Sequence, residues 1–266
     1  MKILLGLTLG YAGFLTSPTL ALAATPMPMA TPMPMASQNM KTVSQTVNFN
    51  PPKPPADPPP GGRVLGGAKR GSCPQVKQDL TALVPFTQEP PSITNVWSLT
   101  TSAHPTFWFY VPYSQQENLP AMFVLQNQQS KELYKQPIAL PKNPGIMSVA
   151  LPVNAPNLAV NQQYRWFLTF ACEKKEESPP VYVYVEGVVK RVNLSQETTK
   201  ELQTATPLQQ FAIYARNGIW HEALTILAKL RQEHPQDPDL RTQWQDLLAS
   251  IRLGNVATEP ILSDKH

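Results

Sequence analysis

The sequence predicts a mainly β protein, with an antiparallel β-sandwich over residues 73–193 and a small α-helical segment over residues 200–255. Three observations lead to this prediction. Short runs rich in Val, Phe, Tyr and Trp recur between Pro, Asn and Gly residues at the spacing of sandwich strands. Several of these runs alternate between two faces, as strands do. After residue 193 the apolar residues recur with the period of a helix instead.

Residues 1–23 have the features of a secretory signal peptide. A single lysine is followed by an apolar run and by Ala21-Leu22-Ala23, a small-residue cleavage site. An uncleaved anchor is the alternative. No later segment reaches the roughly 20 apolar residues that a membrane-spanning helix needs. We therefore expect a secreted protein of the periplasm or the outer envelope, with no transmembrane segment once the signal is cleaved.

A leader rich in proline, methionine and glycine covers residues 24–72, and we expect it to be disordered. The chain has 30 prolines, against about 13 from average usage. Residues 24–35 repeat ATPMPM twice, which predicts a plain spacer or, through the soft thioether sulfurs, a copper(I) site. Residues 51–60, PPKPPADPPP, are typical of a polyproline II spacer. The basic, glycine-rich residues 61–72 indicate a linker, because their spacing does not match a phosphate-binding loop.

The strands of the sandwich are expected near Ile93–Thr100, Thr106–Val111, Ala121–Gln126, Leu133–Leu140, Ile146–Leu151, Tyr164–Cys172 and Val181–Val192. The most aromatic stretch, HPTFWFYVPY over residues 104–113, is apolar on both faces. This favours a central strand that is covered on both sides. Alternatively, Trp108 and Tyr110, together with Trp97, form an exposed flat surface for a ligand such as a carbohydrate.

Residues 151–172 indicate which kind of sandwich forms. In LPVNAPNLAVNQQYRWFLTFAC a leucine and a turn precede a strand that places Tyr164 and Trp166 on one face, as in an immunoglobulin- or fibronectin-like sandwich. We expect Tyr164 to act as a tyrosine corner, with its hydroxyl returning to a backbone group near Leu158. Cys73 and Cys172 are the two cysteines of the chain. In an exported protein this even count predicts a disulfide between them.

The helical segment resembles a tetratricopeptide hairpin followed by one more helix. The apolar residues Trp220, Ala223, Leu224 and Leu227 follow Gly218 at helical intervals. A single hairpin of this kind cannot bury its own apolar face. We therefore expect it to close with the third helix or to dock on the sandwich. Peptide binding in its groove is the alternative to a purely structural role.

The sequence contains no motif for a strand-turn nucleophile, a zinc site or a phosphate loop. The histidines are scattered, and His221, beside Glu222, is expected on the exposed surface of its helix. The acidic residues Glu173, Glu176 and Glu177 stand beside lysines and indicate an exposed loop. We predict neither an enzyme nor a bound cofactor or metal, and no nucleic-acid partner.

Five segments occur in a recognisable order: LTALVP (80–85), HPTFWFYVPY (104–113), FVLQ (123–126), YRWFLTFAC (164–172) and GIWHEAL (218–224). Together they resemble the cyanobacterial family called domain of unknown function 928. HPTFWFYVPY is the most specific of them. The resemblance implies an exported, envelope-associated protein with no assigned activity, and it carries no catalytic residues to transfer.

These observations favour a non-enzymatic binding or scaffolding protein of the cell envelope, whose partner is another envelope protein held by the helices. The second hypothesis is a carbohydrate-binding module that recognises a polysaccharide through Trp97, Trp108 and Tyr110. A hydrolase of unknown type is third, because it requires ionisable groups that converge in a pocket.

Overall fold

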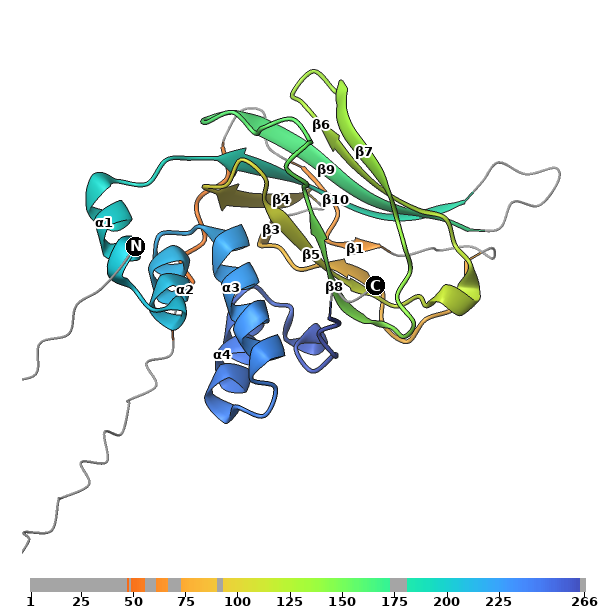
Figure 1. The fold of residues 1–266 in the computed structure, drawn as a ribbon. Helices are drawn as coiled ribbons and strands as arrows, with labels where there is room; N and C mark the ends of the chain where they lie inside the picture. The colour runs from red at the N-terminus through yellow and green to blue at the C-terminus, as the bar shows by residue number, and fades with distance from the viewer. Residues whose placement is uncertain are drawn as a thin grey trace, which may run out of the picture. The chain divides into compact units, whose positions relative to one another are not determined.

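The computed structural model describes residues 47, 49–55, 61–66, 73–89, 93–172 and 181–263. Within them two β-sheets form a sandwich-like body, and helices follow the last strand (Figure 1). The chain is thus mainly β with a helical C-terminal part, as predicted. The predicted signal peptide, the Met-Pro repeat and the acidic residues 173–177 lie outside the described residues. None of the described helices is long and apolar enough to cross a membrane.

The larger sheet has six strands. In spatial order they are β3 (Phe86–Glu89), β4 (Ile93–Thr100), β10 (Tyr182–Arg191), β9 (Gln163–Ala171), β6 (Ala121–Gln126) and β7 (Glu132–Ile138). Neighbours are antiparallel except for β4 and β10, which run parallel with Trp97 opposite Val188. The expectation of a purely antiparallel sandwich is therefore corrected. After β4 the chain crosses to the other sheet, and it returns beside β4 only with the β9–β10 hairpin.

The smaller sheet has four strands. In spatial order they are β1 (Leu65–Gly66), β2 (Leu80–Ala82), β5 (Thr106–Val111) and β8 (Gly145–Ala150). β5 is the central strand that HPTFWFYVPY predicted. On its inner face the rings of Phe107 and Phe109 lie 5.8 and 5.7 Å from that of Trp166 in the larger sheet. On its outer face Trp108 donates a hydrogen bond from Nε1 to Thr225 Oγ1, 3.0 Å away, in the helical part.

Two predicted contacts, a tyrosine hydrogen bond and a disulfide, stabilise the sandwich. The Tyr164 hydroxyl accepts a hydrogen bond of 2.8 Å from the backbone N–H of Ala159, which confirms the tyrosine-corner contact. Cys73 and Cys172 form the predicted disulfide, with their Cα atoms 5.0 Å apart. The disulfide joins the residues before β2 to the end of β9, and thus links a strand of each sheet.

The described part of the predicted leader is packed against the rest of the chain, so its expected disorder is corrected there. Phe49 is 7% exposed, and its ring centroid lies 4.7 Å from that of Trp220. Arg63 and Glu186 exchange two backbone hydrogen bonds of 2.9 Å. Gly62, at φ +136°, fits there because a Cβ atom would come within 2.7 Å of Val96. The prediction of disorder rested on the average composition of residues 24–72, in which the many prolines outweigh these few apolar and glycine residues.

The helical part begins earlier than predicted and contains one more helix. Its helices are α1 (Gln196–Thr204), α2 (Pro207–Arg216), α3 (Trp220–Glu233) and α4 (Pro238–Ser250), followed by a short 3-10 helix, η2 (Gly254–Val256). A second 3-10 helix, η1 (Gln115–Glu117), lies in the sandwich between β5 and β6. Local signals set the boundaries. Thr206 and Gln209 form a capping box before α2, and Asp237 caps α4. Gly218, at φ +70°, makes the turn between α2 and α3.

The helices dock on the sandwich instead of forming a separate domain. α3 packs against β4 and β5, and Figure 1 shows it between α2 and α4 beside the smaller sheet. Buried residues of both parts belong to one continuous apolar core. Trp220 Nε1 donates a hydrogen bond of 2.8 Å to the carbonyl of Leu83, which fixes the first turn of α3 to the end of β2. The apolar stripe that suggested a peptide groove is thus largely core.

Candidate functional site

A pocket of about 210 Å³ lies where the β4–β5 connection meets α2 and α3. We call it the junction pocket. Its wall is made of Ser102, His104, Pro105 and Thr106 from the sandwich and Gln210, Tyr214, His221, Glu222, Thr225 and Ile226 from the helices. Ligand sites usually combine apolar walls with a few convergent polar groups, and pockets for drug-sized molecules measure roughly 300–1,000 Å³. The junction pocket therefore suits a smaller ligand.

Glu222 holds the two sides of this pocket together. Its Oε1 accepts hydrogen bonds from the hydroxyl and N–H of Thr101 (3.0 and 2.8 Å), the hydroxyl of Thr100 (2.7 Å) and the N–H of Ser102 (2.9 Å). Four donors saturate this oxygen. The carboxylate also lies in the first turn of α3, where the helix dipole stabilises negative charge. Glu222 thus clamps the end of β4 to the start of α3.

The second carboxylate oxygen of Glu222 is different. Oε2 is buried and has no hydrogen-bond partner among the described residues. A buried polar atom without a partner costs about 1–3 kcal/mol, and more when it carries charge. Glu222 lines the junction pocket, so an N–H or O–H group that reached Oε2 would satisfy this acceptor.

Tyr214 provides a hydroxyl next to this carboxylate. Burial, and to a smaller extent the negative charge of Glu222, raise the pKa of Tyr214 above its ordinary value of 10.0, while a hydrogen bond with Thr101 acts in the opposite direction. The phenol therefore stays protonated at neutral pH. It can both donate and accept a hydrogen bond in the junction pocket.

His221 is buried, which corrects the expectation that it lies on the helix surface. Its Nδ1 lies 3.0 Å from the carbonyl oxygen of Thr106, and its Nε2 lies 2.9 Å from Ser98 Oγ. A carbonyl oxygen can only accept, so Nδ1 carries the proton and Nε2 accepts from the Ser98 hydroxyl. Burial lowers the pKa of His221 below 6.5, although the Thr106 contact and Glu222 oppose this. The ring is therefore neutral near pH 7.

The Ser98–His221 pair has the hydrogen bond of a nucleophile and its base, but it is not presented to a substrate. The Ser98 side chain is 0% exposed, and the second ring nitrogen of His221 is held by a backbone carbonyl. The imidazole edge also packs on the ring of Phe107, 4.9 Å away. In this arrangement the pair anchors α3 to β4 and β5.

The structure does not bring Trp97, Trp108 and Tyr110 together on an open face. They are 7%, 4% and 6% exposed. Trp108 is covered by α3 through its contact with Thr225, and Trp97 lines a different cleft near residues 51–54. The exposed aromatic surface expected from the sequence is therefore absent, and carbohydrate recognition loses its basis. The physical reason is that α3 covers Trp108 on the outer face of β5, while the prolines of residues 51–54 lie beside Trp97 on β4.

The fold and the junction pocket define a two-sheet β protein that carries a helical cover and a small pocket where the two parts meet. The chain belongs to the family described as Domain of Unknown Function (DUF928), which matches residues 65–261. No curated protein matches the chain. Among solved structures, the soluble domain of PmoD from Methylocystis sp. ATCC 49242 (Rockwell) aligns with 46% of this chain and 99% of its own. At 12% identity and a TM-score of 0.27, it supports no argument about fold or function.

Proposed function

We propose that this protein is a non-enzymatic binding protein of the cell envelope that takes a small amine in the junction pocket. The observation that carries the proposal is the buried, unpartnered Oε2 of Glu222. Glu222 is the one carboxylate among the pocket-lining residues, and none of them is Lys or Arg. A ligand that donates hydrogen bonds and carries positive charge therefore meets both the unused acceptor and a carboxylate that no Lys or Arg of the pocket pairs.

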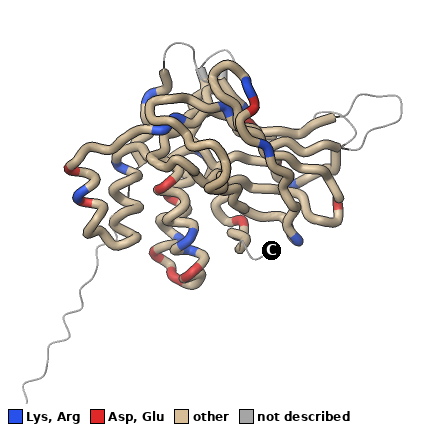
Figure 2. Tube along the Cα trace, turned by 45° about the horizontal axis from the view of Figure 1, so that its top comes forward, with Lys and Arg blue, Asp and Glu red and all other residues tan. Residues whose placement is uncertain are grey.

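Two further observations support this proposal. The disulfide favours an oxidising compartment outside the cytosol, where such bonds persist. The Ser98–His221 pair is buried and committed to structural hydrogen bonds, which favours binding over hydrolysis. Lys, Arg, Asp and Glu are interspersed along the described chain (Figure 2). This is the pattern of an ordinary solvated surface and fits a partner recognised in a pocket, not by a broad charged face.

The test is a thermal-shift and calorimetric screen of small amines, with polyols and small carboxylates of similar size as comparison sets. A binding amine at 100 times its dissociation constant stabilises the fold by about 2.7 kcal/mol. Polyols should have a smaller effect and carboxylates none, because a carboxylate would face Glu222. Equal stabilisation by the three classes, or by none of them, refutes the proposal.

Variants locate the binding. Glu222→Gln removes a charge-assisted hydrogen bond of about 1.5–3 kcal/mol, so amine binding should weaken about 10- to 100-fold. The matched control is Glu233→Gln, an exposed change in the last turn of the same helix, which should leave affinity unchanged. Tyr214→Phe keeps the clamp of Glu222 intact, and it serves if Glu222→Gln does not fold. A wild-type affinity in both pocket variants refutes the site.

A further inference from the structure

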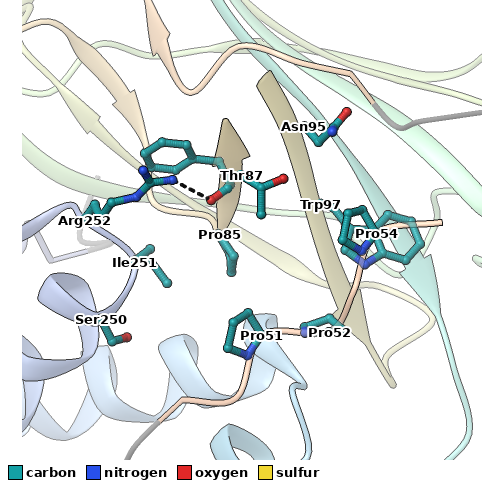
Figure 3. A pocket seen from close by; sticks show the side chains of 11 residues that line it. Pro51, Pro52, Pro54, Pro85, Thr87, Asn95, Trp97, Ser250, Ile251 and Arg252 are labelled. Atoms are coloured by element: carbon teal, nitrogen blue, oxygen red, sulfur yellow. Dashed lines mark hydrogen bonds between the residues drawn. The ribbon is translucent and has the colours of Figure 1, made fainter. Parts of the chain in front are cut away.

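A second cleft, of about 80 Å³, lies between β3–β4, the prolines of residues 51–54 and the residues at the end of α4 (Figure 3). We call it the proline cleft. Pro51, Pro52 and Pro54 line it from the N-terminal segment, and Trp97, Phe86 and Arg252 line it from the body of the protein. The chain thus already seats a proline-rich segment against a tryptophan, which is the chemistry of polyproline recognition.

Hydrogen bonds hold the chain on both sides of the seated prolines: on the C-terminal side the Gly61 carbonyl accepts one of 3.0 Å from the N–H of Val96. Before the prolines, Phe49 is buried and the N–H of Asn50 donates a hydrogen bond of 3.2 Å to the carbonyl of Ala215. The segment crosses the α2–α3 turn so closely that a Cβ atom at Gly218 would lie 2.8 Å from the Asn50 oxygen. Residues 51–55 themselves form no hydrogen bond with the rest of the described chain. Proline has no N–H, so apolar contact holds this stretch in place.

Trp97 brings an unpaired hydrogen-bond donor to the cleft. The side chain is 7% exposed, and its Nε1 is buried without a hydrogen-bond partner among the described residues. A polyproline segment carries carbonyl groups that form no internal hydrogen bonds, so it supplies the acceptors that an indole N–H needs. The chain's own segment covers Trp97 but leaves this donor unpaired.

Arg252 adds a positive charge at the opposite end of the cleft from Pro54 (Figure 3). Its guanidinium lies 4.7 Å from the ring centroid of Phe86 and donates a hydrogen bond of 3.3 Å to the Phe86 carbonyl. Within the described ranges it forms no ion pair. A carboxylate in a bound segment would therefore find a free cation beside the aromatic wall.

The geometry points to a polyproline-binding site: the proline cleft takes a proline-rich segment of a partner protein, with an acidic residue near the prolines, and the chain's own Pro51–Pro55 segment occupies it until that partner arrives. A partner segment displaces the Pro51–Pro55 segment when its own carbonyl group accepts a hydrogen bond from Trp97 Nε1, a bond that the Pro51–Pro55 segment does not form. This inference does not depend on the proposed amine site, because the two sites share no lining residue.

Fluorescence anisotropy with a labelled peptide of sequence PPKPPADPPP tests this inference. The proteins are the full-length chain and its Pro51→Ala/Pro52→Ala/Pro54→Ala variant, in which the resident segment competes less. Apparent affinity falls with the fraction of molecules whose site is open, so the variant should bind the peptide about tenfold more tightly than the wild type. A peptide with Gly and Ser in place of all prolines is the control and should not bind.

Two further variants, made in the triple-variant background, show where the peptide binds. Trp97→Phe keeps an aromatic ring but removes the N–H, and should weaken binding about tenfold, the size of one hydrogen bond. Arg252→Gln should weaken binding of PPKPPADPPP more than of a peptide that has Asn for its Asp. If Trp97→Phe does not fold, the indole N–H resonance of Trp97 should shift on peptide addition. Equal binding by wild type and triple variant, full affinity without the indole N–H, or an unmoved resonance overturns the inference.

Discussion

Removal of the disulfide should cost this protein a large share of its stability. Cys73 and Cys172 are 99 residues apart in sequence, and the loop that they close contains β2 to β9. Chain-entropy arguments give about 4.7 kcal/mol for a cross-link that closes a loop of about 100 residues. Residual structure in the unfolded chain reduces this value, so we expect a loss of about 3–4 kcal/mol in the Cys73→Ser/Cys172→Ser variant.

Urea unfolding followed by tryptophan fluorescence measures this loss. The unfolded variant is freed from its cross-link and exposes more surface, so the denaturant slope should rise together with the fall in midpoint. A reductant should destabilise the wild type by a similar amount and should not affect the double variant. If the variant unfolds within about 1 kcal/mol of the wild type at an unchanged slope, the reasoning about loop closure is refuted.

Two further predictions concern the helical cover and the leader. Because burial lowers the pKa of His221 below its ordinary value of 6.5, the unfolded chain binds this proton first as pH falls. The stabilisation that neutral His221 provides is therefore fully present above about pH 6.5 and is lost progressively as pH falls towards its lowered folded-state pKa. In chemical denaturation between pH 5 and 8, the free energy of unfolding of His221→Gln should depend less on pH than that of the wild type. Identical pH dependence in the two proteins would contradict the buried, neutral state of His221. Phe49→Ala should destabilise the fold by about 3–5 kcal/mol, as for other buried phenylalanines, whereas Leu65→Ala, which changes a side chain that is 47% exposed, should have little effect; a neutral Phe49→Ala would show that the leader does not pack.

Several strands were predictable from the sequence. The boundaries of β4, β5 and β6 agree with the prediction to the residue, because each run of apolar and β-branched residues starts directly after Pro91-Ser92, Pro105 or Pro120. β2 and β3 have only three and four residues, too few to show a period. Helix α1 buries no side chain and so has no apolar stripe, which explains why the helical segment was expected to start too late.

The junction pocket could not be predicted, because its parts are distant in sequence. Glu222 reaches Thr100 and Thr101 across more than 120 positions, and no local pattern reports such a contact. A partial signal was present in GIWHEAL. Trp220 and His221 are adjacent in the first turn of α3, and both are buried. A helix that buries neighbouring residues is covered on more than one side, so a polar residue among them needs a specific partner.

The parallel pairing of β4 with β10 has a consequence for how the chain folds. Ser98 on β4 and Val188 on β10 are in contact although 90 residues separate them. The larger sheet therefore joins its β3–β4 hairpin to the other four strands only after nearly the whole sandwich has been synthesised. Contacts of such long sequence separation slow folding, because the entropy of closing the loop is lost before they form. Until then β4 and β10 each present an open edge, and this interval is when the protein is most exposed to aggregation.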